Sequence, residues 1–192
     1  MLNRLEVKEA MIHLSGPSPE FRAALKPYPE AVLRRLNLPP ALDEALREAG
    51  LPRGLPCCVF EENPIAFYPE PLPRRYALIP GEYLEIARMD WVGVIALDRR
   101  DGRVWQIFEK EFRRSFMNRS LPQYTACLGI WMAFYPRFQE YLAARLRENP
   151  GFSLFENPEV YEPVRRRLAE ADPEAMAEEG HYWPRCCEPD IV

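Results

Sequence analysis

The sequence predicts an α+β fold, in which an antiparallel β-sheet of about six strands is flanked by N-terminal and C-terminal helices. Two observations lead to this prediction. Apolar, strand-like runs gather in the middle of the chain, and helical patterns lie on both sides of them. A parallel sheet would instead need helices alternating with its strands. We find no internal repeat and no long linker, so residues 1–192 are expected to form a single domain.

The N-terminal part, residues 1–56, is expected to consist of short helices separated by prolines. Ser18-Pro19-Glu20 and Pro29-Glu30 are typical helix starts, because proline suits the first helical turn. Gly50 is a typical residue to end a helix, since glycine readily adopts a positive φ. Residues 1–35 form an N-terminal extension that matches no motif we can name.

The sheet is predicted within residues 57–118, where β-branched and aromatic residues alternate with turn residues. Between its last two strands, Asp98 to Gly102 reads as a turn in which Gly102 supplies the positive φ. A short element from Phe116 then leads into a helix. The expected strands are residues 58–60, 65–68, 76–79, 83–87, 91–97 and 104–108.

The C-terminal part, residues 120–184, is predicted to be mainly helical. Ser120 and Gln123 have the spacing of a capping box, and apolar residues recur from there at steps of three and four. Pro136 is expected to kink or break this first helix, because proline removes one helical hydrogen bond. A loop over residues 149–158 and further helix over residues 159–180 should follow.

Charge and composition exclude several classes of protein. The net charge of −4 and pI near 5.4 argue against a dedicated nucleic-acid binder, which usually carries a basic face. The N-terminus has no signal-peptide core, and the apolar run 126–134 is too short to cross a bilayer. An odd number of cysteines, five, argues against a disulfide framework. We therefore expect a cytoplasmic protein with no membrane partner.

No residues combine into a predicted catalytic, cofactor or metal site. His181 with Cys186-Cys187 supplies too few ligands for zinc and has no Cys-x-x-Cys spacing. A Cys–His catalytic pair would need an activating histidine and an oxyanion-stabilising motif, and the chain has only two histidines. The sequence thus predicts a protein that is not an enzyme and that binds neither cofactor nor metal.

Several motifs together resemble a known family. Leu-Asp-x-x-x-Gly-x-Val-Trp from Leu97, followed by Phe-Met-Asn-x-Ser-Leu and a helix, resembles the SUKH superfamily of bacterial immunity proteins, most closely its fourth immunity group. The segments Ala49–Pro52, Asp172–Ala175 and Trp183-Pro184 agree with this resemblance, which covers roughly residues 36–184. One departure is Arg119, where a second serine often follows the asparagine.

The resemblance implies a non-enzymatic protein that binds and neutralises a cognate polymorphic toxin, of the nuclease or deaminase class, by steric blockade. A regulatory scaffold of the same fold with no toxin partner is the alternative. The resemblance also implies structural roles for five motif residues, Gly102, Asn118, Ser120, Asp172 and Trp183.

Uneven charge suggests where a partner would bind. Residues 140–180 hold five arginines against ten acids, so this helical part would attract a basic toxin, although ordinary solubility explains the acids as well. The same ambiguity applies to Trp105, which is either an apolar anchor or a residue packed at the rim of the core. The candidate partner-binding residues are Glu159, Glu162 and Glu170 on one surface, and Asp98, Asp101, Glu109 and Glu111 with Trp105 on a second. We expect a monomer or weak dimer that binds its toxin 1:1.

Overall fold

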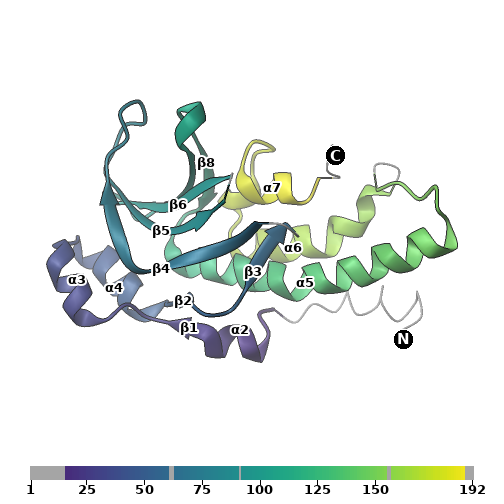
Figure 1. Cartoon of the computed structure of the whole chain (residues 1–192), viewed down its shortest axis with the longest axis horizontal. Helices are drawn as coiled ribbons and strands as arrows, with labels where there is room; N and C mark the ends of the chain where they lie inside the picture. The colour runs from purple at the N-terminus through teal and green to yellow at the C-terminus, as the bar shows by residue number, and fades with distance from the viewer. Residues whose placement is uncertain (1–15, 61–62, 91, 155–156, 189–192) are drawn as a thin grey trace.

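The computed structural model describes residues 16–60, 63–90, 92–154 and 157–188. Its N-terminal part holds three short helices and a two-stranded sheet (Figure 1). Ser18 caps the first helix by accepting a hydrogen bond from the Phe21 N–H, and the second follows Pro29, so both predicted starts are confirmed. These elements are α2 (Pro19–Ala24), β1 (Leu25–Lys26), α3 (Glu30–Leu36), α4 (Pro40–Glu48) and β2 (Leu51–Pro52).

The two-stranded sheet was not predicted, and Gly50 explains how it forms. Gly50 lies just after α4 with φ +65°. A Cβ at this position would lie 2.9 Å from backbone atoms of Lys26. Only glycine therefore allows β2 to approach β1 this closely while the chain leaves α4.

Six antiparallel strands form the main sheet, in the same order as in the sequence. Each strand pairs with the next one along the chain, as in a meander. Helices precede and follow this antiparallel sheet along the chain, so the α+β prediction is confirmed. The strands are β3 (Cys57–Phe60), β4 (Asn63–Arg74), β5 (Tyr83–Met89), β6 (Gly93–Asp98), β7 (Val104–Phe108) and β8 (Arg113–Asn118).

Two of the predicted strand positions need correction. Residues 76–79 are not a strand but part of the β4–β5 loop, where Ile79 packs on the face of the sheet. The sixth strand is instead β8. Its first residues, Arg113-Arg114-Ser115, are polar and lack the apolar pattern that predicts a strand. Trp91, which was expected to begin a strand, lies outside the described residues.

The long helix α5 (Leu121–Glu148) lies along one face of the sheet and extends beyond it, as Figure 1 shows. It continues through Pro136, so the alternative of a broken helix is wrong. After the loop, α6 (Glu162–Ala171) returns beside α5. The remaining elements are the short 3-10 helices η1 (Glu109–Glu111), η2 (Pro158–Tyr161) and η3 (Glu174–Met176), and helix α7 (Tyr182–Cys186).

The sheet buries apolar residues on both faces. The inner face contributes Leu84, Ile95 and Leu97 to the main core with α5. Alternate residues point the other way, as the pleat of a strand requires. They form a second, smaller cluster beneath the β4–β5 loop, which consists of Ile79, Tyr83, Val94, Ala96 and Ile107.

Ser120 begins α5, and this cap should contribute measurably to stability. Its Oγ accepts a hydrogen bond from the Gln123 N–H at 3.5 Å and donates one to Gln123 Oε1 at 2.7 Å. Replacing Ser120 by alanine should lower the free energy of unfolding by about 1 kcal/mol, because one helix N–H loses its partner. Urea denaturation measures this loss. Ser120→Asp is the control, since aspartate also caps helices; equal losses in both variants would contradict the capping role.

Candidate partner-binding surface

Three of the motif residues form a buried polar cluster. Asn118 ends β8, Asp172 ends α6 and Trp183 lies in α7, and each has 0% of its surface exposed. Asn118 joins the other two: its Nδ2 donates to Asp172 Oδ2 at 3.1 Å, and its Oδ1 accepts from Trp183 Nε1 at 2.8 Å. These side chains fix β8, α6 and α7 to one another and lie out of reach of a partner.

Asp172 also holds the start of α5. Its Oδ2 accepts a hydrogen bond from the Arg119 N–H at 2.9 Å, one residue before the helix cap Ser120. Cys127 joins the cluster as well, because Asn118 Nδ2 lies 3.3 Å from its Sγ. Sequence reasoning missed Cys127 and Arg119, since nothing in a sequence pairs residues with a carboxylate about fifty positions away.

The structure corrects the candidate role of Asp98. Its side chain is only 7% exposed, with the carboxylate accepting from the Arg100 N–H at 2.9 Å and lying 3.9 Å from Arg114 Nη1. Asp98 therefore shapes the β6–β7 turn, where Gly102 has φ +75°, and is not an exposed charge that could attract a partner.

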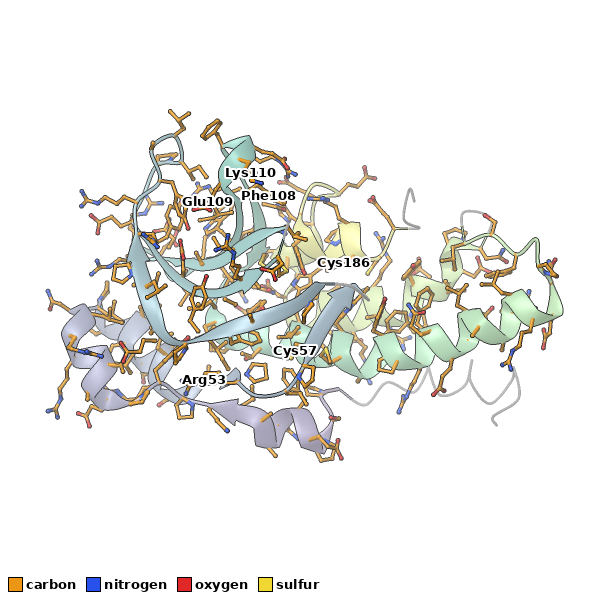
Figure 2. All side chains as sticks on the ribbon, viewed as in Figure 1. Arg53, Cys57, Phe108, Glu109, Lys110 and Cys186 are labelled. Atoms are coloured by element: carbon orange, nitrogen blue, oxygen red, sulfur yellow. The ribbon has the colours of Figure 1, made fainter. Side chains whose placement is uncertain are left out.

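The four acids predicted as one surface lie at two ends of β7. Asp98 and Asp101 belong to the turn before β7, whereas Glu109 and Glu111 belong to η1 after it. Arg103, just before β7, and Glu109, just after it, are about six residue steps apart, and at about 3.4 Å per step the two groups lie roughly 20 Å from each other. Figure 2 shows Glu109 and Lys110 together in the turn that projects from the sheet.

Trp105 is half-buried and is covered by an arginine. The Arg114 guanidinium lies 3.9 Å from the centre of its ring, and Phe116 packs against it edge-on at 5.4 Å. Both contacts come from β8, the strand beside it. A partner could reach this tryptophan only at its uncovered edge or by displacing Arg114.

The acids of the helical part remain exposed but several are paired. Glu159 and Glu162 are exposed, whereas Glu170 lies 2.8 Å from Arg167 Nη1. Glu174, also on this part, lies 2.9 Å from Arg103 Nη1. These pairs lower the effective negative charge of this surface, although exposed ion pairs stabilise the fold by little.

Two exposed apolar side chains were missed by sequence reasoning. Leu78 is 65% exposed in the β4–β5 loop, and Phe112 is 60% exposed just after η1. Both loops project from the sheet in Figure 1. Phe112 has φ +50°, a backbone conformation that is unusual for a large side chain. A hollow of about 480 Å³ beside it is lined by Asp90, Glu109 and Glu111, among other residues.

The described residues hold no group of three or more His, Cys, Asp or Glu placed to bind a metal. Within the same residues, no helix is long and apolar enough to span a membrane. Cys57, Cys127, Cys186 and Cys187 are buried and are not in disulfides. Burial raises the pKa of Cys127 and of Cys187 to about 12, which keeps both thiols protonated at neutral pH.

Comparison with known proteins decides the family. The model of the SUKH-4 immunity protein family matches residues 22–189, which is most of the chain. The chain belongs to the SUKH-4 immunity protein family. No curated protein matches, and no solved structure matches either.

Membership in the SUKH-4 family suggests a role in toxin immunity and implies a toxin as partner. Proteins of this kind are generally non-enzymatic. The family match extends further towards both ends than the motifs did, since these covered roughly residues 36–184. It thereby includes the end of α2, all of α3 and the end of helix α7.

The Asp172 cluster should matter strongly for stability. Asp172→Ala leaves the buried Asn118 Nδ2 and the part-buried Arg119 N–H without their acceptor, so the free energy of unfolding should fall by about 3 kcal/mol. Guanidinium denaturation measures the loss. Glu140→Ala, which removes an exposed carboxylate from α5, is the control and should change stability by less than about 0.5 kcal/mol. Similar values for both variants would contradict the role of this cluster.

The raised thiol pKa values predict slow alkylation of the folded protein. Near pH 8, only about one molecule in ten thousand carries a thiolate at Cys127 or Cys187, because their pKa of about 12 is about four units higher. Iodoacetamide followed by peptide mass spectrometry should find both residues unmodified, and modified after unfolding. The folded state holds these protons more tightly than the unfolded state, so stability should decrease as pH rises from 9 towards 12. Rapid labelling of native Cys127 would contradict this prediction.

Proposed function

We propose that this protein neutralises a cognate polymorphic toxin, of the nuclease or deaminase class, by binding it 1:1 and covering its active site or substrate surface. The family match over residues 22–189 is the observation that carries the proposal. Steric blockade needs a firm surface and no chemistry of its own. The sheet, held to its helices by the Asp172 cluster, offers such a surface.

The η1 turn has features that favour protein binding. Phe112 is a large apolar side chain exposed among charged residues, and interfaces commonly centre on such an anchor within a polar rim. Glu109 and Glu111 are exposed on either side of Lys110 in the same turn, and Glu111 is paired with Arg113. Their carboxylates suit a partner with a basic surface, as expected for a toxin that acts on nucleic acid.

Exposed acids would also accelerate the encounter with a basic toxin. Glu159 and Glu162 on the helical part and Glu109 and Glu111 on η1 are the exposed carboxylates that could do so. Their attraction is screened over about 10 Å at 0.1 M salt, so the association rate should fall as salt rises. A fast association is useful, because the toxin must be bound before it reaches its substrate.

The test uses the cognate toxin, identified by co-purification with this protein from its native host and mass spectrometry. Co-expression should protect the host cell from this toxin, and the two purified proteins should form a 1:1 complex. Phe112→Asn should weaken binding about tenfold or more, since the anchor is lost while asparagine tolerates the positive φ. Its melting temperature should not fall.

Glu140→Lys is the control for the charge-reversal variants Glu109→Lys and Glu111→Lys. Both reversals on η1 should slow association at low salt, whereas the control on α5 should have little effect. A wild-type protein that neither protects the cell nor binds the toxin would refute the proposed function and favour a regulatory scaffold.

A further inference from the structure

A second hollow lies at the other end of the strands from η1. It measures about 700 Å³ and opens between the α3–α4 connection, the end of the β4–β5 loop and the β6–β7 turn. Three arginines, Arg99, Arg100 and Arg114, contribute to its lining, together with Glu82 and Asp98. Their charges make this hollow different from the acidic surfaces described above.

Arg114 is held rigidly at the wall of the hollow. Its guanidinium stacks on Trp105 at 3.9 Å, donates a hydrogen bond to the Tyr83 hydroxyl and lies 3.9 Å from Asp98 Oδ2. The Tyr83 hydroxyl in turn donates to the Pro80 carbonyl at 2.8 Å. A guanidinium fixed in this way loses little conformational entropy when it binds an anion.

Arg99 and Arg100 have different roles. Arg99 Nη2 donates to the Leu36 carbonyl at 3.0 Å, which fixes the turn to the end of α3. Arg100 has 84% of its side chain exposed, and its nearest carboxylate, that of Asp101, lies 3.7 Å away. Arg100 is therefore available to an incoming ligand, whereas Arg99 mainly builds the wall.

Each of the three arginines of the hollow has a carboxylate nearby. Asp98 lies 3.9 Å from Arg114, Asp101 lies 3.7 Å from Arg100, and Glu82 is shared between Arg75 and Arg99. An adjoining hollow of about 230 Å³, which shares Glu82 and Arg99, adds the exposed Arg74 and Arg75 to the same region, and Arg74 lies 3.5 Å from Glu85. The region therefore holds five arginines against four carboxylates, an excess of one positive charge, and the exposed Arg100 is its most accessible guanidinium.

We infer that this arginine-lined hollow docks an acidic, carboxylate-bearing segment of the toxin. The inference rests on the proposed function, which supplies a protein partner. Arginine binds carboxylates through two parallel hydrogen bonds, and the exposed Arg100 guanidinium is accessible for such a contact beside the fixed Arg114. The whole protein has a net charge of −4, so the attraction for an anion must come from the arginines around the hollow.

The hollow and the η1 turn together would orient the toxin. They lie at opposite ends of β7, roughly 20 Å apart, a span that fits within an interface of ordinary size. The hollow has three arginines against two carboxylates in its lining, whereas the hollow beside η1 has three carboxylates against Arg88 and Lys110. A partner with the opposite arrangement would be attracted in one orientation and repelled in the reverse one.

The experiment uses a fluorescein-labelled hexaglutamate peptide with blocked ends, and its binding is followed by fluorescence anisotropy at about 20 mM salt. The wild type should bind this peptide measurably and should not bind the matching hexalysine peptide at the same site. Arg100→Glu should weaken hexaglutamate binding about tenfold or more, and Arg114→Gln should weaken it as well. Arg166→Glu is the control, since it makes the same charge change on α6 and should alter binding less than about twofold.

Three outcomes would overturn the inference. The first is a loss of peptide binding in Arg166→Glu as large as in Arg100→Glu, which would reveal general charge effects. The second is no binding of hexaglutamate by the wild type. The third is Arg100-dependent binding of inorganic phosphate that displaces the peptide, which would assign the hollow to a phosphate ligand.

The peptide assay contains no toxin, so its failure is separate from failure of the proposed function. If the wild type protects cells but does not bind the peptide, only the docking site is wrong. If the inference holds, Arg100→Glu should also reduce protection against the toxin while the melting temperature is unchanged. Full protection by a folded Arg100→Glu variant would overturn the docking site, and failed protection by the wild type would overturn the proposed function itself.

Discussion

The arrangement of the whole protein depends on one buried carboxylate, that of Asp172. A buried carboxylate is costly unless hydrogen bonds replace its water, and Asp172 Oδ2 obtains these from Asn118 and from the backbone of Arg119, while Oδ1 has no hydrogen-bond partner among the described residues. Through Asn118 the same network reaches Trp183 in α7. Three segments distant in sequence thus have a common hydrogen-bonded centre, and the sheet is held against α5 in one orientation. The surfaces that we propose for toxin binding lie on this rigid frame.

On the outer face of the sheet, the buried contacts of the β4–β5 loop explain why Leu78 is exposed. The β4–β5 loop folds over this face, where Ile79 is buried and the Tyr76 hydroxyl donates to the buried Glu85 carboxylate at 2.6 Å. Burial, and then the bond to Glu85, raise the pKa of Tyr76, so the phenol remains a donor at neutral pH. Because the loop is anchored by these residues, Leu78 between them is left pointing to solvent.

Local signals in the sequence predicted local structure well. Helix starts at Ser18, Pro29 and Ser120 follow from capping and proline geometry, and β7 has the predicted bounds because the Asp-Gly turn precedes it. Features that depend on pairing were not predictable in the same way. Asp98 is buried because Arg114 lies beside it, and Trp105 is covered because β8 places Arg114 over its ring. The register between β7 and β8 decides both, and no local pattern encodes that register.

The positions that carry the family resemblance and those that would choose the partner are physically separate. Asn118, Asp172 and Trp183 are fully buried, which means that they specify the fold and lie out of reach of a toxin. Arg100 lies between motif positions in the β6–β7 turn, and Phe112 lies outside the motifs altogether, yet both side chains are exposed. Substitutions there would change the charge and shape of the surface without disturbing the buried network. One stable frame can therefore present different surfaces: the family match implies a toxin partner, and on our proposal the exposed residues would select which toxin is bound.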